Sequence, residues 1–241
     1  MIEKTSPVEY LYVKALIKKI IKSKNVYNIF PESGIIFIHI PKTGGLSIKN
    51  LLVNLKDDTI SNKDKKNYYY LEELKRKRIS SIHGKAKDIL ELLDEDMIKK
   101  SLKFSTIRNP WALMVSSYHW WLQNGYKFPR IKHMYLDIKK KTFKEYLMST
   151  YGTKMINECV GNIEDWVKDD NKKIILDGLI RLENFDEEFK NLIKKKNKNI
   201  IGLKPIKKIN FSNHEKYANY YDSQCIEIIE KRFDFIIRNY G

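Results

Sequence analysis

The feature that most constrains this 241-residue chain is an apolar run that ends in a glycine-bearing turn and resumes with helical spacing. Residues 35–40 are rich in strand-forming side chains, and the turn from Pro41 to Gly45 follows them directly. Beyond the turn, apolar residues recur at helical spacing at Ile48, Leu51, Leu52 and Leu55. The pattern predicts a strand, a loop and a helix N-terminus in succession.

A helix that starts after such a loop is suited to binding an anion. Its first-turn N–H groups have no intrahelical partner, and the helix dipole adds partial positive charge. Lys42 adds a cation, and Thr43 and Ser47 add two hydroxyls. The lysine precedes the glycines, whereas a Walker A loop has the opposite order, so the turn is not that motif. We predict a phosphate-binding loop of another type; a plain structural Gly-Gly turn is the alternative.

A second junction of this kind lies further along the chain. Residues 104–108 have the pattern of a short strand that ends at Arg108, and Asn109 and Pro110 are typical of an N-cap and a first helical position. Ser116 follows two helical turns later. A guanidinium can bind a phosphate through two parallel hydrogen bonds, and a hydroxyl can add another. The junction therefore predicts a second phosphate contact; the alternative is a salt-bridged arginine and a solvent-facing serine.

The turn from Pro41 to Ser47 resembles the 5′-phosphosulfate loop of sulfotransferases that use 3′-phosphoadenosine 5′-phosphosulfate (PAPS), in particular the carbohydrate sulfotransferases. The second junction resembles the segment with which these enzymes bind the 3′-phosphate of the cofactor, through residues that match Arg108 and Ser116. The resemblance covers roughly residues 34–241. It departs from the family after Pro110, where an acidic-basic pair common in the family is missing.

The resemblance implies that PAPS is the cofactor, that the nucleotide product is 3′-phosphoadenosine 5′-phosphate (PAP), and that no metal is needed. It assigns cofactor binding to Pro41, Lys42, Thr43, Gly44, Gly45, Leu46, Ser47, Arg108 and Ser116. Lys42 is also expected to be catalytic, because a cation must meet the charge that gathers on the departing nucleotide. The five histidines are scattered and form no spaced ligand set with cysteine.

The acceptor hydroxyl needs a general base, and histidine titrates nearest to neutral pH. We choose His83, which lies between a predicted strand end and a predicted helix and resembles the histidine that the family places at the acceptor site. An exposed turn histidine is the structural alternative. Glu91 and His119 are the other candidate bases, and His39, inside the first strand, is expected to be structural.

The length suits a single α/β domain with a full core. We expect a central parallel β-sheet flanked by helices, with the P-loop NTPase-like sulfotransferase architecture that the resemblance implies and the cofactor at the carboxyl ends of the strands. The sulfotransferase domain would span residues 34–241, after an extension at 1–33. Within that extension, residues 10–22 predict an amphipathic basic helix that docks on the core or on an anionic membrane. The polar stretches 57–67 and 194–208 predict loops.

Charge and composition bear on ligands and location. The formal net charge of +16 favours acidic ligands, and PAPS is itself highly anionic. No apolar run approaches the ~20 residues that span a bilayer. The N-terminus has no secretory signal pattern, and two cysteines cannot form a disulfide scaffold. We therefore expect a cytoplasmic protein, with peripheral contact to the inner membrane surface through residues 10–22 as an open alternative.

These observations predict transfer of a sulfuryl group from PAPS to a hydroxyl, with a carbohydrate as the preferred acceptor. A small-molecule or lipid-linked hydroxyl is the alternative acceptor. The rival from another class is a non-catalytic basic protein that binds a nucleotide or polyanion, although nucleic acid is a disfavoured partner. Aromatic side chains would stack on sugar rings unless the core buries them. The candidates are Trp111, Trp120, Trp121 and the run from Tyr68 to Tyr70.

Overall fold

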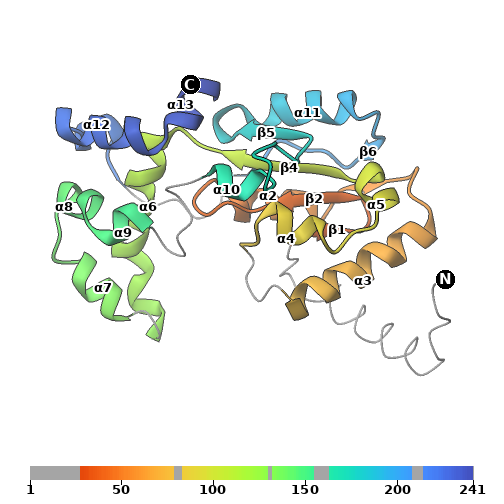
Figure 1. Cartoon of the computed structure of the whole chain (residues 1–241), viewed down its shortest axis with the longest axis horizontal. Helices are drawn as coiled ribbons and strands as arrows, with labels where there is room; N and C mark the ends of the chain where they lie inside the picture. Colours follow the sequence, from red (N-terminus) through yellow and green to blue (C-terminus); the bar gives the residue numbers. More distant parts are fainter. Residues whose placement is uncertain (1–27, 79–82, 130–131, 155–162, 208–213, 241) are drawn as a thin grey trace.

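The computed structural model describes residues 28–78, 83–129, 132–154, 163–207 and 214–240, so the helix predicted at 10–22 lies outside the described residues (Figure 1). A four-stranded sheet in the order β1-β2-β4-β5 forms the centre. Its strands are β1 (Ile29–Phe30), β2 (Ile35–Ile38), β4 (Leu102–Ile107) and β5 (Gly178–Arg181). The last three are parallel and β1 is an antiparallel edge strand. The predicted α/β fold with a central parallel sheet flanked by helices is confirmed, with β1 as an antiparallel addition at one edge.

Helices cover both faces of this sheet, which explains why β1 and β2 are entirely apolar and why β4 is buried along its whole length. Ile35 and Phe37 of β2 share one core cluster with residues of two helices, and Ile36 and Ile38 belong to a second cluster on the opposite face. The first face packs against α2 (Gly45–Leu52) and α11 (Phe185–Lys195). The second face packs against α3 (Asn62–Arg78), α4 (Ala86–Leu90) and α5 (Glu95–Lys100).

A group of helices lies beyond the carboxyl ends of β2 and β4 (Figure 1). It comprises α6 (Pro110–Asn124), η1 (Gly125–Lys127), α7 (Lys132–Ile138), α8 (Phe143–Met148), α9 (Thr150–Lys154), α12 (Ser223–Arg232) and α13 (Asp234–Tyr240). The Arg232 guanidinium donates to the carbonyls of Gly152 and Leu147, which ties α12 to the α8–α9 hairpin. Within the described ranges, no helix combines the length and apolar character needed to cross a membrane.

The loop predicted at residues 57–67 is wrong. Asp57 belongs to β3 (Lys56–Asp57), which pairs with β6 (Ile200–Ile201), and α3 begins at Asn62. The polar residues are caps and buried ion-pair partners: the Ser61 hydroxyl accepts from the Asp64 backbone N–H at 3.1 Å, and the Asp57 carboxylate lies 3.3 Å from the Lys198 ammonium. The second predicted loop, 194–208, is wrong in part, because its first two residues end α11 and its middle contains β6.

Candidate functional site

The turn between β2 and α2 has a backbone that only glycine tolerates at two positions. Gly44, the N-cap of α2, has a φ of 82°, and a Cβ there would lie 2.5 Å from the Leu182 side chain. A Cβ on Gly45 would lie 1.8 Å from the ring of His39. The loop therefore packs directly on His39, which follows β2, and on Leu182, which follows β5. The first N–H groups of α2 have no partner within the helix.

Two threonines hold this loop to the neighbouring strand. The buried Thr43 hydroxyl donates to the Ile40 carbonyl at 2.8 Å, and the Thr106 hydroxyl of β4 donates to the Thr43 carbonyl at 3.0 Å. The Thr43 hydroxyl that we expected at the ligand is thus engaged within the protein, so its backbone is the part left for an anion. Sequence analysis missed Thr106, whose only signal is a polar residue in an apolar strand.

The second junction has the predicted caps. The Asn109 side chain accepts from the Ala112 N–H at 3.0 Å, and Pro110 is the first residue of α6. Ser116 is buried two turns further along the helix. Arg108, directly after β4, donates from Nη1 to the Lys42 carbonyl at 3.3 Å. The structure thus joins the two predicted phosphate-binding junctions at one edge of the sheet.

Two basic side chains, Lys42 and Arg108, meet at this edge. Burial, and then the neighbouring Arg108 charge, lowers the pKa of Lys42 from 10.5 to about 7. Burial also lowers the pKa of Arg108, while the carboxylate of Glu183 opposes that effect. No carboxylate among the described residues offsets the shift of Lys42. Two partly buried cations side by side, at two helix N-termini, favour an anionic ligand.

His83 lies beside the same loop, shortly before α4. Its Nδ1 is 2.9 Å from the His39 carbonyl, and the two rings are 4.4 Å apart between centroids. A carbonyl can only accept, so this contact places the proton of a neutral His83 on Nδ1 and leaves Nε2 as the basic nitrogen. His83 is half-buried, not an exposed turn residue. The predicted strand end before it falls on residues outside the described ranges.

The other candidate bases lie in different surroundings. Glu91 is exposed at the end of α4, where its carboxylate is 3.9 Å from the Lys87 ammonium. His119 packs against the rings of His214 and Tyr220 at 5.3 and 5.2 Å, and burial lowers its pKa. Among the contacts of the described residues, those of His83 include His39, which packs against Gly45 of the loop, whereas those of Glu91 and His119 do not include His39 or the loop.

The aromatic residues proposed for sugar stacking differ in how far they are buried. Trp121 and Tyr68 are 1% exposed core residues, so stacking on a ligand is wrong for both. Trp120 is half-buried, and the Lys42 ammonium lies 4.8 Å from its ring centroid. Tyr70 is exposed and Trp111 half-buried. The sequence could not separate adjacent tryptophans, because the side of α6 that meets the core is decided by tertiary packing.

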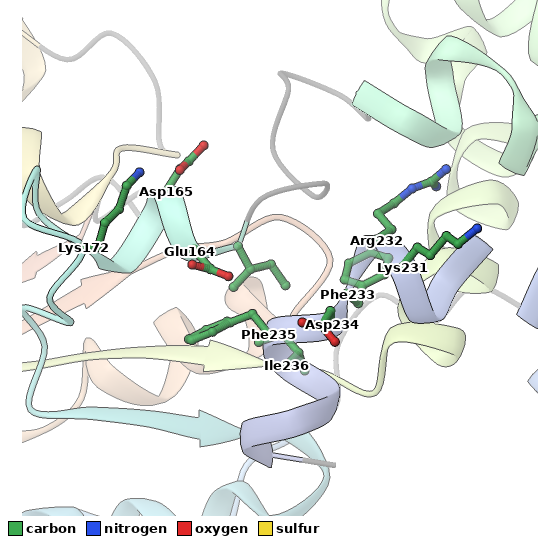
Figure 2. Close-up of a pocket in the computed structure, with 10 residues that line it drawn as sticks. Glu164, Asp165, Lys172, Lys231, Arg232, Phe233, Asp234, Phe235 and Ile236 are labelled. Atoms are coloured by element: carbon green, nitrogen blue, oxygen red, sulfur yellow. The ribbon is translucent and has the colours of Figure 1, made fainter. Parts of the chain in front are cut away.

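A cavity of about 400 Å³ lies between α10 (Glu164–Val167) and the junction of α12 and α13 (Figure 2). Acidic and basic side chains line it together, including Asp165, Lys172 and Arg232. It includes no residue of the loop at 41–47. Its lining combines opposite charges and its arginine already serves backbone carbonyls, so we place the candidate site at the loop. In the described part of the chain, no cluster of three potential metal ligands occurs.

Comparison with known proteins identifies the family. No match was found among characterised proteins or among solved structures. The model of the sulfotransferase family matches residues 25–240, which is most of the chain and includes both junctions. The chain therefore belongs to the sulfotransferase family.

Proposed function

We propose that this protein transfers a sulfuryl group from PAPS to a hydroxyl of a carbohydrate acceptor. The observation that carries the proposal is the pairing of Lys42 and Arg108 at adjoining helix starts in a member of the sulfotransferase family. PAPS has phosphate on both sides of its ribose, so one ligand can satisfy both junctions. When bound, PAPS would supply a sulfuryl group already activated by a phosphate leaving group.

The residues around the loop fit such a ligand. Gly45 lets the start of α2 pack directly against the His39 ring, since a Cβ at this position would overlap that ring. The N–H groups of the loop and of the first turn would hold the 5′ end. Arg108 and Ser116 would hold the 3′-phosphate by charge-assisted and hydroxyl hydrogen bonds.

Lys42 would place its positive charge where the departing phosphate gathers negative charge. Its location explains why this charge is effective: burial weakens solvent screening, so the attraction between the ammonium and an oxyanion is stronger there than in water. The same burial disfavours the ammonium in the ligand-free protein and lowers its pKa to about 7. A bound anion would stabilise the ammonium and raise the pKa of Lys42 again.

His83 would remove the proton of the acceptor hydroxyl. Its Nδ1–H is occupied by the His39 carbonyl, which leaves Nε2 to accept a proton. His39 in turn packs under Gly45. The proposed base is therefore linked to the loop through His39, and this link would fix the position of His83 relative to the loop.

Thermal unfolding with and without PAP tests the proposal. A ligand that binds only the folded state at 100 times its Kd stabilises it by about 2.7 kcal/mol. We expect PAP to raise Tm clearly and AMP, which lacks the 3′-phosphate, to raise it much less. No shift with PAP, together with steeply salt-dependent binding of polyanions, would instead support a basic binding protein. Sulfate transfer assayed on sugars, lipid-linked alcohols and small alcohols then identifies the acceptor class.

Arg108→Ala should weaken PAP binding by roughly 10- to 150-fold, because a hydrogen bond to a charged group contributes about 1.5–3 kcal/mol. Ser116→Ala should have a smaller effect, and AMP affinity should change little in either variant. Titration calorimetry gives all four values. Arg181→Ala is the matched control, since it removes an exposed arginine that pairs with Glu188 at the end of β5. Equal loss of PAP and AMP affinity in Arg108→Ala would contradict the 3′-phosphate assignment.

A further inference from the structure

The ammonium of Lys42 contacts the indole of Trp120, although the two residues are far apart in the sequence. Lys42 comes from the loop after β2, and Trp120 from the later half of α6. The Nζ lies 4.8 Å from the ring centroid. This distance is within the ~6 Å over which the electron-rich face of an indole attracts a cation.

The indole packs against two other aromatic rings. Its ring centroid lies 5.5 Å from that of Trp121, a buried neighbour, and 5.6 Å from that of Phe128. Trp120 also belongs to the helix that begins beside Arg108, which is bonded to the Lys42 carbonyl. The loop, the start of α6 and the indole are therefore connected through one helix, and the ring is a pre-positioned surface for the lysine.

Among the described residues, the charged groups near Lys42 do not attract its ammonium. Arg108, after β4, repels it and contributes to its low pKa. Glu183, in η3 (Leu182–Asn184), accepts from the Asn109 N–H at 2.9 Å and acts on Arg108. His39 lies at the other end of the loop, beneath Gly45. In the described structure, the contact that favours the ammonium of Lys42 is thus the indole face.

We propose that Trp120 is the positioning residue for Lys42, holding its ammonium at the loop until the sulfuryl donor binds. The role assigned to Lys42 after binding rests on the proposed function, but the contact itself belongs to the ligand-free protein. Trp120 then serves the reaction through Lys42 and need not touch the acceptor. Without the ring, burial and Arg108 would both drive the lysine towards its neutral form or out into solvent.

Proton NMR of protein labelled at the lysine ε-carbon tests the contact without any ligand. Protons above an aromatic ring are shifted upfield, so the Lys42 εCH₂ signal, assigned by its loss in Lys42→Arg, should lie upfield of the other lysines. Trp120→Leu should return it to the ordinary position, and Trp120→Phe should keep part of the shift. Trp111→Leu is the matched control on the same helix, and it should change nothing. An ordinary Lys42 signal in the parent protein would by itself overturn the proposal.

The pH dependence of the same signal separates positioning from simple packing. The ring favours the charged lysine, so Trp120→Leu should lower the titration midpoint of Lys42 by about one pH unit. The alkaline limb of kcat/KM, which reports the free enzyme, should move in the same direction. An unchanged midpoint in folded Trp120→Leu would overturn the proposal. If the parent fails to bind PAP while these NMR shifts occur, the proposed function fails and the Lys42–Trp120 contact stands.

Discussion

Replacing His83 with asparagine is expected to lower kcat by roughly 10²- to 10⁴-fold, the usual contribution of a general base, while PAP-induced stabilisation persists. Asparagine is the informative substitution because its amide N–H can still donate to the His39 carbonyl, as Nδ1 does. The packing beside the loop is then retained while the proton acceptor is lost. Turnover with saturating donor and the PAP thermal shift are the two measurements.

Two matched variants decide between the candidate bases. His119→Asn removes a histidine that packs against His214 and Tyr220, and Glu91→Gln removes an exposed carboxylate. Both should keep activity near that of the parent if His83 is the base. If His83→Asn remains active and one of the others is inactive but still stabilised by PAP, the base assignment moves to that residue.

Replacing Lys42 with methionine should lower kcat by roughly 10²- to 10³-fold, comparable to the loss of one electrostatic contact to the transition state. Methionine has a similar length and can still lie on the Trp120 ring, so the change is mainly one of charge. Removing a buried cation next to Arg108 relieves repulsion, so folding should not suffer. Single-turnover rates measure the effect on transfer, and calorimetry measures donor affinity. A higher KM with unchanged kcat would show that Lys42 only binds the donor.

The same variant should alter how PAP binding depends on pH. In the ligand-free parent the pKa of Lys42 is about 7, and a bound anion raises it. The bound state therefore holds more protons above this pH, so affinity should fall as pH rises from about 7 towards the bound-state pKa. Below about 7 the lysine is charged in both states and this contribution is constant. Lys42→Met should lose the alkaline decline, and an unchanged decline would assign it to another group.

The two junctions were predictable because their signals are local. The glycines after Lys42 and the Asn109–Pro110 pair each favour a helix start through the conformation of a few neighbouring residues. The structure has helix starts at both places. Parallel pairing of β2 with β4 follows from the same alternation of strands and helices. Because both strands end at one edge, the expected meeting of the two junctions was also within reach of the sequence.

The remaining features depend on contacts between distant segments. The bond between Thr106 and the Thr43 carbonyl and the cation over Trp120 each join segments more than sixty residues apart. No local pattern encodes such a pairing. The start of α3 was missed for a different reason, since capping residues such as Ser61 have the same composition as a loop. Polarity alone could not distinguish a cap from a turn.

The adjacency of β2 and β4 has a consequence for ligand choice. Neighbouring strands lie roughly 4.8 Å apart, and the chain after each of these two strands leads into a helix start. The separation of the two cationic junctions is therefore set by the hydrogen-bond ladder of the sheet and by the bonds that tie the loop at Thr43 and Lys42 to the end of β4. We expect this fixed separation to select among nucleotides. A nucleotide with phosphates on opposite sides of its sugar can contact both junctions, whereas a linear triphosphate places its charge at only one of them.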